Sequence, residues 1–291
     1  MSVIVNGSGG SEKVTIDGVK VNRLLNLTSD KFNINVGRLN YTFTLGCAVV
    51  FNGEIHILGG NGSLHLKWNG STWDTVSTLP YSLQQGCAVV YDGCIHIIGG
   101  YSNATKHYKW DGSSWSQVAT LPFDSRGSSA VVLNNEIHLL GSTSDSYERK
   151  HFKFNGTNWI NTSVLPYDFY YGSAVVFNNE IHILGTYESN LETRHYKWNG
   201  SEWITLSTLP VYHAYGCALV HDGYIYLLGG TSASTYAYKF DGVKWERAED
   251  LPVAFSQGSA VLYENAICLL GGYNDSTQFH MLGVKLYKEV I

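Results

Sequence analysis

Short apolar runs separated by tight turns follow one another along most of this chain. Six copies of one pattern begin at a small residue, and successive starts lie 40, 42, 44, 44 and 42 residues apart. The starts are Gly46, Gly86, Ser128, Gly172, Gly216 and Gly258. Each copy continues through two apolar runs joined by a two-residue turn, a glycine-led loop and an aromatic run. The first five copies then add a tryptophan and a Leu-Pro pair. A period of this length predicts a circular or stacked array of structural repeats.

The second copy illustrates how one repeat is expected to fold. Residues 88–91 and 95–98 are β-rich runs joined by Asp92-Gly93, a pair suited to a type I′ turn, in which both central residues take positive φ. A third run covers residues 108–110. A fourth run opens at Trp115 and stops before Pro122, which cannot donate a ladder hydrogen bond. Four such antiparallel strands make one propeller blade, so we predict an all-β, six-bladed β-propeller.

The sixth copy lacks the tryptophan and Leu-Pro that end the others. Residues 34–39 precede Gly46 at the spacing with which residues 204–209 precede Gly216. We therefore expect an N-terminal strand to complete the sixth blade and close the ring, which removes exposed sheet edges. The predicted organisation is a propeller over residues 31–291 and a separate N-terminal segment over residues 1–30.

The N-terminal segment contains a predicted β-hairpin. Residues 13–16 and 19–22 flank Asp17-Gly18, and their pairing would place four apolar side chains on one face. A lone two-stranded hairpin is marginally stable in water. We expect it to attach to its own propeller or to a partner protein.

Composition narrows the range of partners. The net charge of −5 provides no basic surface, so nucleic acid is not an expected partner. No apolar run is long enough to cross a bilayer, and the start of the chain has no secretory signal pattern. Three of the five cysteines, Cys47, Cys87 and Cys217, share a repeat position that other copies fill with serine. This pattern favours small reduced side chains over disulfides.

Recurring glycine and aromatic positions resemble those of kelch repeats over roughly residues 32–288. The doubled glycines are Gly59-Gly60, Gly99-Gly100, Gly229-Gly230 and Gly271-Gly272, and the later tryptophans are Trp73, Trp115, Trp159, Trp203 and Trp245. The third and fourth copies depart from this pattern with Gly141-Ser142 and Gly185-Thr186. The resemblance implies a propeller. It extends to two enzyme groups, copper oxidases of sugar alcohols and sialic acid mutarotases.

Most chemically conspicuous residues recur with the repeat and are expected to be structural. Four histidines share one position in the second strand, too far apart to bind a common metal ion: His56, His96, His138 and His182. The aromatic residues that close the third run are expected to pack between blades. No catalytic, phosphate-binding or metal-binding motif is present, so neither enzymatic activity nor a cofactor is predicted.

The two faces of the ring are expected to differ. Turns between strands one and two, and between strands three and four, are nearly all Asn-Gly or Asp-Gly. Blade-to-blade segments and the loops between strands two and three vary, and they emerge on the opposite face, called here the variable face. In peptide-binding kelch domains, contacts come from the residue two before the opening glycine and the residue after the double glycine. The predicted ligand-binding residues are Gln84, Tyr101, Arg126, Tyr170, Tyr171, Tyr187, His213 and Tyr215.

Tyrosines beside small polar groups suit a neutral sugar or a protein surface. The predicted function is therefore non-catalytic recognition of a glycan or a protein, without membrane insertion. This is compatible with a phage-tail or tailocin component synthesised in the cytoplasm. One alternative is a sugar epimerase or mutarotase that uses Asp124, Arg126, Asp168 and His213 at the channel mouth. The other is an intracellular protein-interaction adaptor.

Overall fold

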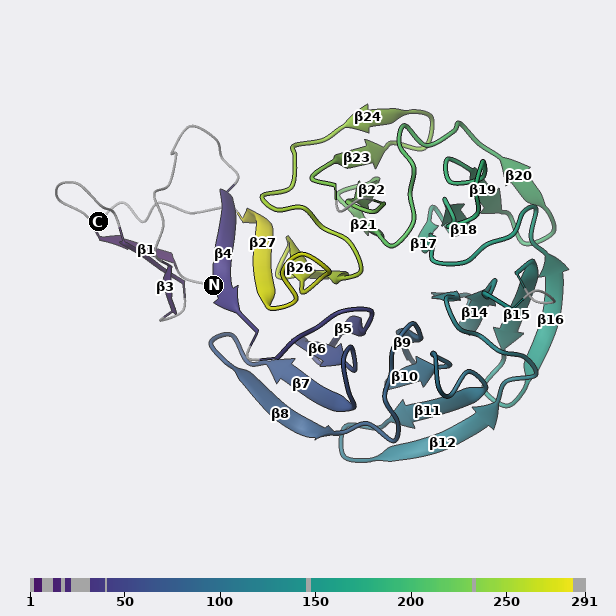
Figure 1. The fold of residues 1–291 in the computed structure, drawn as a ribbon, viewed down its shortest axis with the longest axis horizontal. Coiled ribbons are helices and arrows are strands. Elements are labelled where there is room, and N and C mark those ends of the chain that lie inside the picture. Colours follow the sequence, from purple (N-terminus) through teal and green to yellow (C-terminus); the bar gives the residue numbers. More distant parts are fainter. Residues whose placement is uncertain are drawn as a thin grey trace.

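Six four-stranded sheets stand around a central axis in this protein (Figure 1). The computed structural model describes residues 3–6, 13–16, 19–21, 32–39, 41–144, 148–231 and 234–284. Every regular element within these residues is a β-strand. In each of the first five blades the strands run in sequence order from the axis to the rim (Figure 1). The six-bladed propeller predicted from the repeat is confirmed.

Blades 1 to 3 share nearly identical strand lengths. Blade 1 comprises β5 (Cys47–Phe51), β6 (Glu54–Leu58), β7 (Leu64–Trp68) and β8 (Trp73–Thr78). Blade 2 comprises β9 (Cys87–Tyr91), β10 (Cys94–Ile98), β11 (Lys106–Trp110) and β12 (Trp115–Thr120). Blade 3 comprises β13 (Ser129–Leu133), β14 (Glu136–Leu140), β15 (Lys150–Phe154) and β16 (Trp159–Val164).

Blades 4 and 5 have shorter outer strands, and blade 6 draws its outer strand from the start of the chain. Blade 4 comprises β17 (Ser173–Phe177), β18 (Glu180–Leu184), β19 (His195–Trp198) and β20 (Trp203–Thr205). Blade 5 comprises β21 (Cys217–His221), β22 (Tyr224–Leu228), β23 (Ala237–Phe240) and β24 (Trp245–Arg247). Blade 6 comprises β25 (Ser259–Tyr263), β26 (Ala266–Leu270), β27 (Gln278–Val284) and β4 (Phe32–Arg38).

Ring closure occurs as predicted. Strand β4 pairs antiparallel with β27, with Arg38 opposite Gln278, so that the two ends of the repeat array share one sheet (Figure 1). Two further backbone hydrogen bonds hold the segment between β4 and blade 1 against blade 6. The N–H of Leu39 donates to the carbonyl of Thr277 over 2.6 Å, and that of Phe43 donates to the carbonyl of Ser276 over 2.7 Å. Closure covers the edge of β27 that the missing sixth outer strand would leave exposed.

The N-terminal sheet is larger than the predicted hairpin. Strands β2 (Lys13–Ile16) and β3 (Val19–Val21) pair in the expected register, with Ile16 opposite Val19. Strand β1 (Val3–Asn6) adds a third strand on the other edge of β2. Strand β1 was not predicted, because its apolar run is short and a stretch of polar residues and glycines separates it from β2. This sheet lies outside the ring, and β3 contacts β4 (Figure 1).

Between the blades, buried aromatic rings pack with histidine pairs. Each of blades 1 to 4 joins a second-strand histidine to a third-strand histidine through Nδ1 and Nε2, over 2.7–2.9 Å. The pairs are His56–His65, His96–His107, His138–His151 and His182–His195. Their side chains are at most 5% exposed. The structural role expected for the second-strand histidines is confirmed, and their partners are an addition from the structure.

Candidate functional site

A closed ring of six backbone hydrogen bonds lies on the variable face, just before the inner strands begin. The residue before the opening position of each repeat donates its N–H to the carbonyl of its counterpart one blade earlier, over 2.7–2.9 Å. We call these six residues the mouth ring: Leu45, Gln85, Gly127, Tyr171, Tyr215 and Gln257. They lie above an axial cavity of about 230 Å³ lined by the small residues that start the inner strands.

The mouth ring has a uniform backbone and varied side chains. All six residues have positive φ, between 54° and 71°. This conformation costs an L-residue about 1–2 kcal/mol, and the ring of bonds offsets that cost. Because the backbone repeats and the side chains do not, the ring presents different chemistry in each sector. Two mouth-ring residues, Tyr171 and Tyr215, are among the predicted ligand-binding residues, whereas in blade 2 the predicted residue was the preceding one, Gln84.

Four tyrosines from blades 4 and 5 gather beside the mouth ring. We call Tyr170, Tyr171, Tyr187 and Tyr215 the tyrosine cluster. The rings of Tyr171 and Tyr215 stack with centroids 4.5 Å apart, and Tyr187 meets Tyr215 edge-on at 5.0 Å. Tyr187 is 54% exposed, so the cluster presents an aromatic surface to solvent. The structure therefore brings together four of the eight residues predicted as a site.

Tyr171 extends from blade 4 to blade 2. Its hydroxyl donates to Oε1 of Gln85 over 2.8 Å, and its ring passes over Gly127 of the intervening blade. A Cβ atom at Gly127 would lie 3.0 Å from Cε1 of Tyr171 and 2.8 Å from Cγ2 of Thr143. Glycine at this position therefore serves both the positive φ and the path of the tyrosine ring.

Arg126 and Tyr101 form the other side of the site. The Arg126 guanidinium lies 5.2 Å from the ring centroid of Tyr101, which is 58% exposed. Nε of Arg126 donates to Oγ1 of Thr143 over 2.8 Å. Among the residues that the structure describes, no carboxylate forms an ion pair with Arg126. The bond to Thr143 fixes the guanidinium, whose terminal nitrogens can donate further hydrogen bonds.

Glu188 supplies an acceptor at the opposite edge of the cluster. The Tyr170 hydroxyl donates to Oε2 of Glu188 over 2.6 Å. Burial, followed by this bond and by nearby carboxylates, raises the pKa of Tyr170 above its usual range. Burial likewise raises the pKa of Tyr171 and Tyr215. At neutral pH these three phenols are therefore protonated and can donate hydrogen bonds.

His213 does not belong to this site, and its prediction as a ligand-binding residue is wrong. Its side chain is fully buried, and Nε2 lies 2.9 Å from Oγ of Ser173. Burial lowers the pKa of His213 to about 4, so the ring is neutral. Its repeat position is occupied in other blades by buried residues such as Phe43, Phe169 and Phe255. His213 is therefore not available as one of the acid/base residues considered for a mutarotase.

Gln84 has a backbone role, and the ligand contact predicted for its side chain stays a prediction. Its carbonyl accepts the N–H of Tyr101 over 2.7 Å, which anchors the loop that carries Tyr101. The neighbouring Gln85 provides the side chain that contacts the cluster. Gln85 and Glu188 were missed because the sequence analysis followed family contact positions. Gln85 had a visible signal, since its repeat position holds two tyrosines, two glutamines, a leucine and a glycine.

Comparisons with known proteins identify the fold. No protein-family model matches the chain, and no curated protein matches it. A solved structure titled "Structure of YjhT" matches with a TM-score of 0.71 at 14% sequence identity, over 84% of this chain and 95% of that one. The likeness shows the fold alone. The kelch resemblance stays a prediction.

Two kinds of feature, membrane-spanning helices and metal-binding clusters, are absent from the described residues. No helix there is long and apolar enough to span a membrane. The same residues contain no group of three or more histidine, cysteine, aspartate or glutamate side chains arranged to hold a metal ion.

Proposed function

We propose that this protein is a non-catalytic recognition module that binds an uncharged, hydroxyl-rich glycan on the variable face. The observation that carries the proposal is the tyrosine cluster, flanked by fixed polar groups on both sides. Tyr187 and Tyr101 expose more than half of their surface, and their rings can stack on the apolar face of a sugar. Arg126 supplies donors, and Glu188 supplies an acceptor, for the hydroxyl groups.

A rigid scaffold favours such a role. The backbone bonds of the mouth ring hold Tyr171 and Tyr215 in place, so little side-chain freedom is lost when a ligand binds. Protonated phenols and an uncompensated guanidinium add directional hydrogen bonds. The biological setting we propose is recognition of a cell-surface glycan by a phage-tail or tailocin-type particle, in which no catalytic group is required.

The test is binding to an array of neutral glycans, followed by calorimetry with the strongest ligand. We expect Tyr187→Ala to weaken binding at least tenfold, about 1.4 kcal/mol, because it removes the most exposed ring of the cluster. Tyr273→Ala is the matched control: Tyr273 occupies the same repeat position in blade 6, is 71% exposed and lies outside the cluster. A wild-type protein that binds no arrayed glycan, or equal losses in the two variants, would contradict the proposal.

A further inference from the structure

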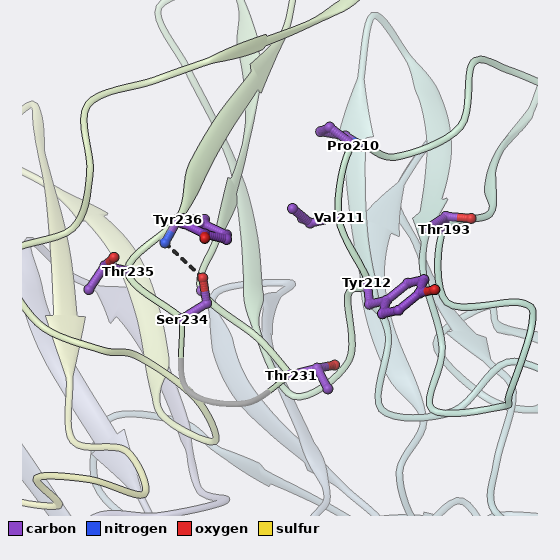
Figure 2. Close-up of a pocket in the computed structure, with 9 residues that line it drawn as sticks. Thr193, Pro210, Val211, Tyr212, Thr231, Ser234, Thr235 and Tyr236 are labelled. Carbon is purple, nitrogen blue, oxygen red and sulfur yellow. Dashed lines mark hydrogen bonds between the residues drawn. The ribbon is translucent and has the colours of Figure 1, made fainter.

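A groove of about 760 Å³ opens between blades 4 and 5, apart from the tyrosine cluster. Figure 2 shows its two walls. Tyr212 and Thr193 stand on one side, Ser234 and Tyr236 stand on the other, and Val211 lies between them (Figure 2). Tyr212 is 66% exposed and Tyr236 is 46% exposed. The groove therefore has an accessible aromatic ring on each wall.

One repeat position beside the groove lacks the aromatic ring that three other segments carry. The residue after Leu-Pro is Tyr81, Phe123 or Tyr167 in the three preceding segments, and each is buried. Each packs on an aromatic ring in the third strand of the next blade, with centroids 4.7–5.8 Å apart. The segment before blade 5 carries Val211 at this position. A valine side chain leaves unfilled the space that a ring occupies before blades 2, 3 and 4.

The lining is polar without being charged. Every lining residue that the structure describes is neutral. Within the described part of the chain, the hydroxyls of Thr193, Thr231 and Thr235 form no hydrogen bond. The Arg247 guanidinium lies 4.3 Å from the ring centroid of Tyr236 and holds that ring in position. Two aromatic rings and the threonine hydroxyls along the same groove suit a ligand that has both an apolar face and hydroxyl groups.

We propose that this groove is a second carbohydrate subsite, which binds neutral sugar rings of a glycan that continues from the tyrosine cluster. One loop, residues 211–215, carries Tyr212 into the groove and Tyr215 into the cluster. Three residues span at most about 11 Å. A single oligosaccharide can therefore contact both places. This inference rests on the proposed function and assigns its ligand to extended neutral oligosaccharides.

Charge and shape argue against the other occupants. A charged peptide or an acidic glycan would find no charged residue among the described lining residues, and the Arg247 guanidinium beside Tyr236 already pairs with Asp250. A single aromatic side chain of a protein partner would fill only part of a groove of about 760 Å³. An extended neutral chain uses the full length of the groove and both of its tyrosines.

The test restores the missing ring. Val211→Tyr recreates the residue found at this position before blades 2 and 4, and it should fill the groove without disturbing the fold. Val253→Tyr makes the same change before blade 6 and serves as the matched control. The probes are the monosaccharides and hexasaccharides of the cello-, malto-, manno- and chito-series, measured by calorimetry.

We expect Val211→Tyr to weaken hexasaccharide binding at least tenfold and to leave monosaccharide binding within twofold, while Val253→Tyr changes neither. Tyr212→Ala, a change at an exposed residue, should also weaken hexasaccharide binding and covers the case in which Val211→Tyr fails to fold. Equal hexasaccharide affinity in wild type, Val211→Tyr and Tyr212→Ala overturns the inference.

The outcomes separate this inference from the proposed function. If only Tyr187→Ala weakens hexasaccharide binding, the site at the tyrosine cluster is supported and the groove subsite is refuted. If only Val211→Tyr and Tyr212→Ala weaken it, the site at the tyrosine cluster is refuted and the groove is supported. If the wild type binds none of the probes, both are refuted.

Discussion

Acidification should unfold this propeller in a narrow pH range, because eight histidines are buried as neutral pairs. Burial lowers the pKa of His65, His107, His151 and His195 to about 3. It lowers the pKa of His56, His96 and His182 to about 4, and it lowers that of His138 in the same direction. In the unfolded chain each imidazole regains its ordinary value, near 6.5. Unfolding below pH 6.5 is therefore coupled to proton uptake.

The sign and size of the effect follow from this difference. The stability is fully present above pH 6.5 and decreases as the pH falls toward the folded values of about 3 to 4. At pH 5 each histidine reduces the free energy of unfolding by about 2 kcal/mol. The seven paired histidines whose pKa falls to about 3 or 4 amount to about 14 kcal/mol, and His138 adds in the same direction, against a usual stability of about 5–15 kcal/mol. We therefore expect an acid transition between about pH 5 and pH 6.

The assay is urea denaturation at a series of pH values, with proton uptake taken from the pH dependence of the unfolding free energy. The matched variant is His56→Cys with His65→Phe, which copies the blade 6 pair Cys268 and Phe279. Phe279 contacts two tryptophan rings as His65 does, so the substitution fits an existing packing pattern. The paired histidines should contribute nearly eight protons to this uptake in the wild type and six in the variant, so the two proteins should differ by about two protons. A wild-type uptake of one or two protons, or no difference between the proteins, would refute the reasoning.

Two smaller predictions concern single positions. Gly127→Ala should cost about 2 kcal/mol or more in urea denaturation, because its new Cβ meets Thr143 at a positive φ. Gly112→Ala, also at positive φ but with no atom within 4 Å, should cost about 1 kcal/mol. Equal costs would refute the steric argument. Cys47 and Cys94 are both partly exposed, but desolvation raises the pKa of Cys47 to about 12, so iodoacetamide at pH 8 should alkylate Cys94 before Cys47. Mass spectrometry that finds Cys47 modified first would contradict the raised pKa of Cys47.

The fold was predictable because its signals repeat. Turn pairs such as Asp92-Gly93, the Leu-Pro pairs and the missing sixth Trp…Leu-Pro run each carry local information, and together they predicted the blades and the closing strand β4. The histidine pairs carried a signal of the same kind. His65 and its counterparts recur two residues before the repeat's lysine, but their contact with the second strand appears only when the strand register is known.

The site was less predictable because it depends on the direction in which each side chain points as well as on the position of the residue in the repeat. His213 and Tyr215 lie two residues apart in one segment, yet one side chain is fully buried and the other joins the exposed cluster. The bond from Tyr171 to Gln85 links residues 86 positions apart, and no local pattern predicts it. The groove was missed for a related reason. Val211 is an ordinary residue until the rings that fill the equivalent spaces are known.

The most direct test of glycan recognition is a crystal structure of the protein bound to the neutral oligosaccharide that the array selects. We predict sugar density on the variable face, stacked on Tyr187 or Tyr101, with hydroxyl groups within hydrogen-bond distance of Arg126 or Glu188. Sugar density confined to the Asn-Gly and Asp-Gly turns of the opposite face, or to the outer rim, would contradict the central claim.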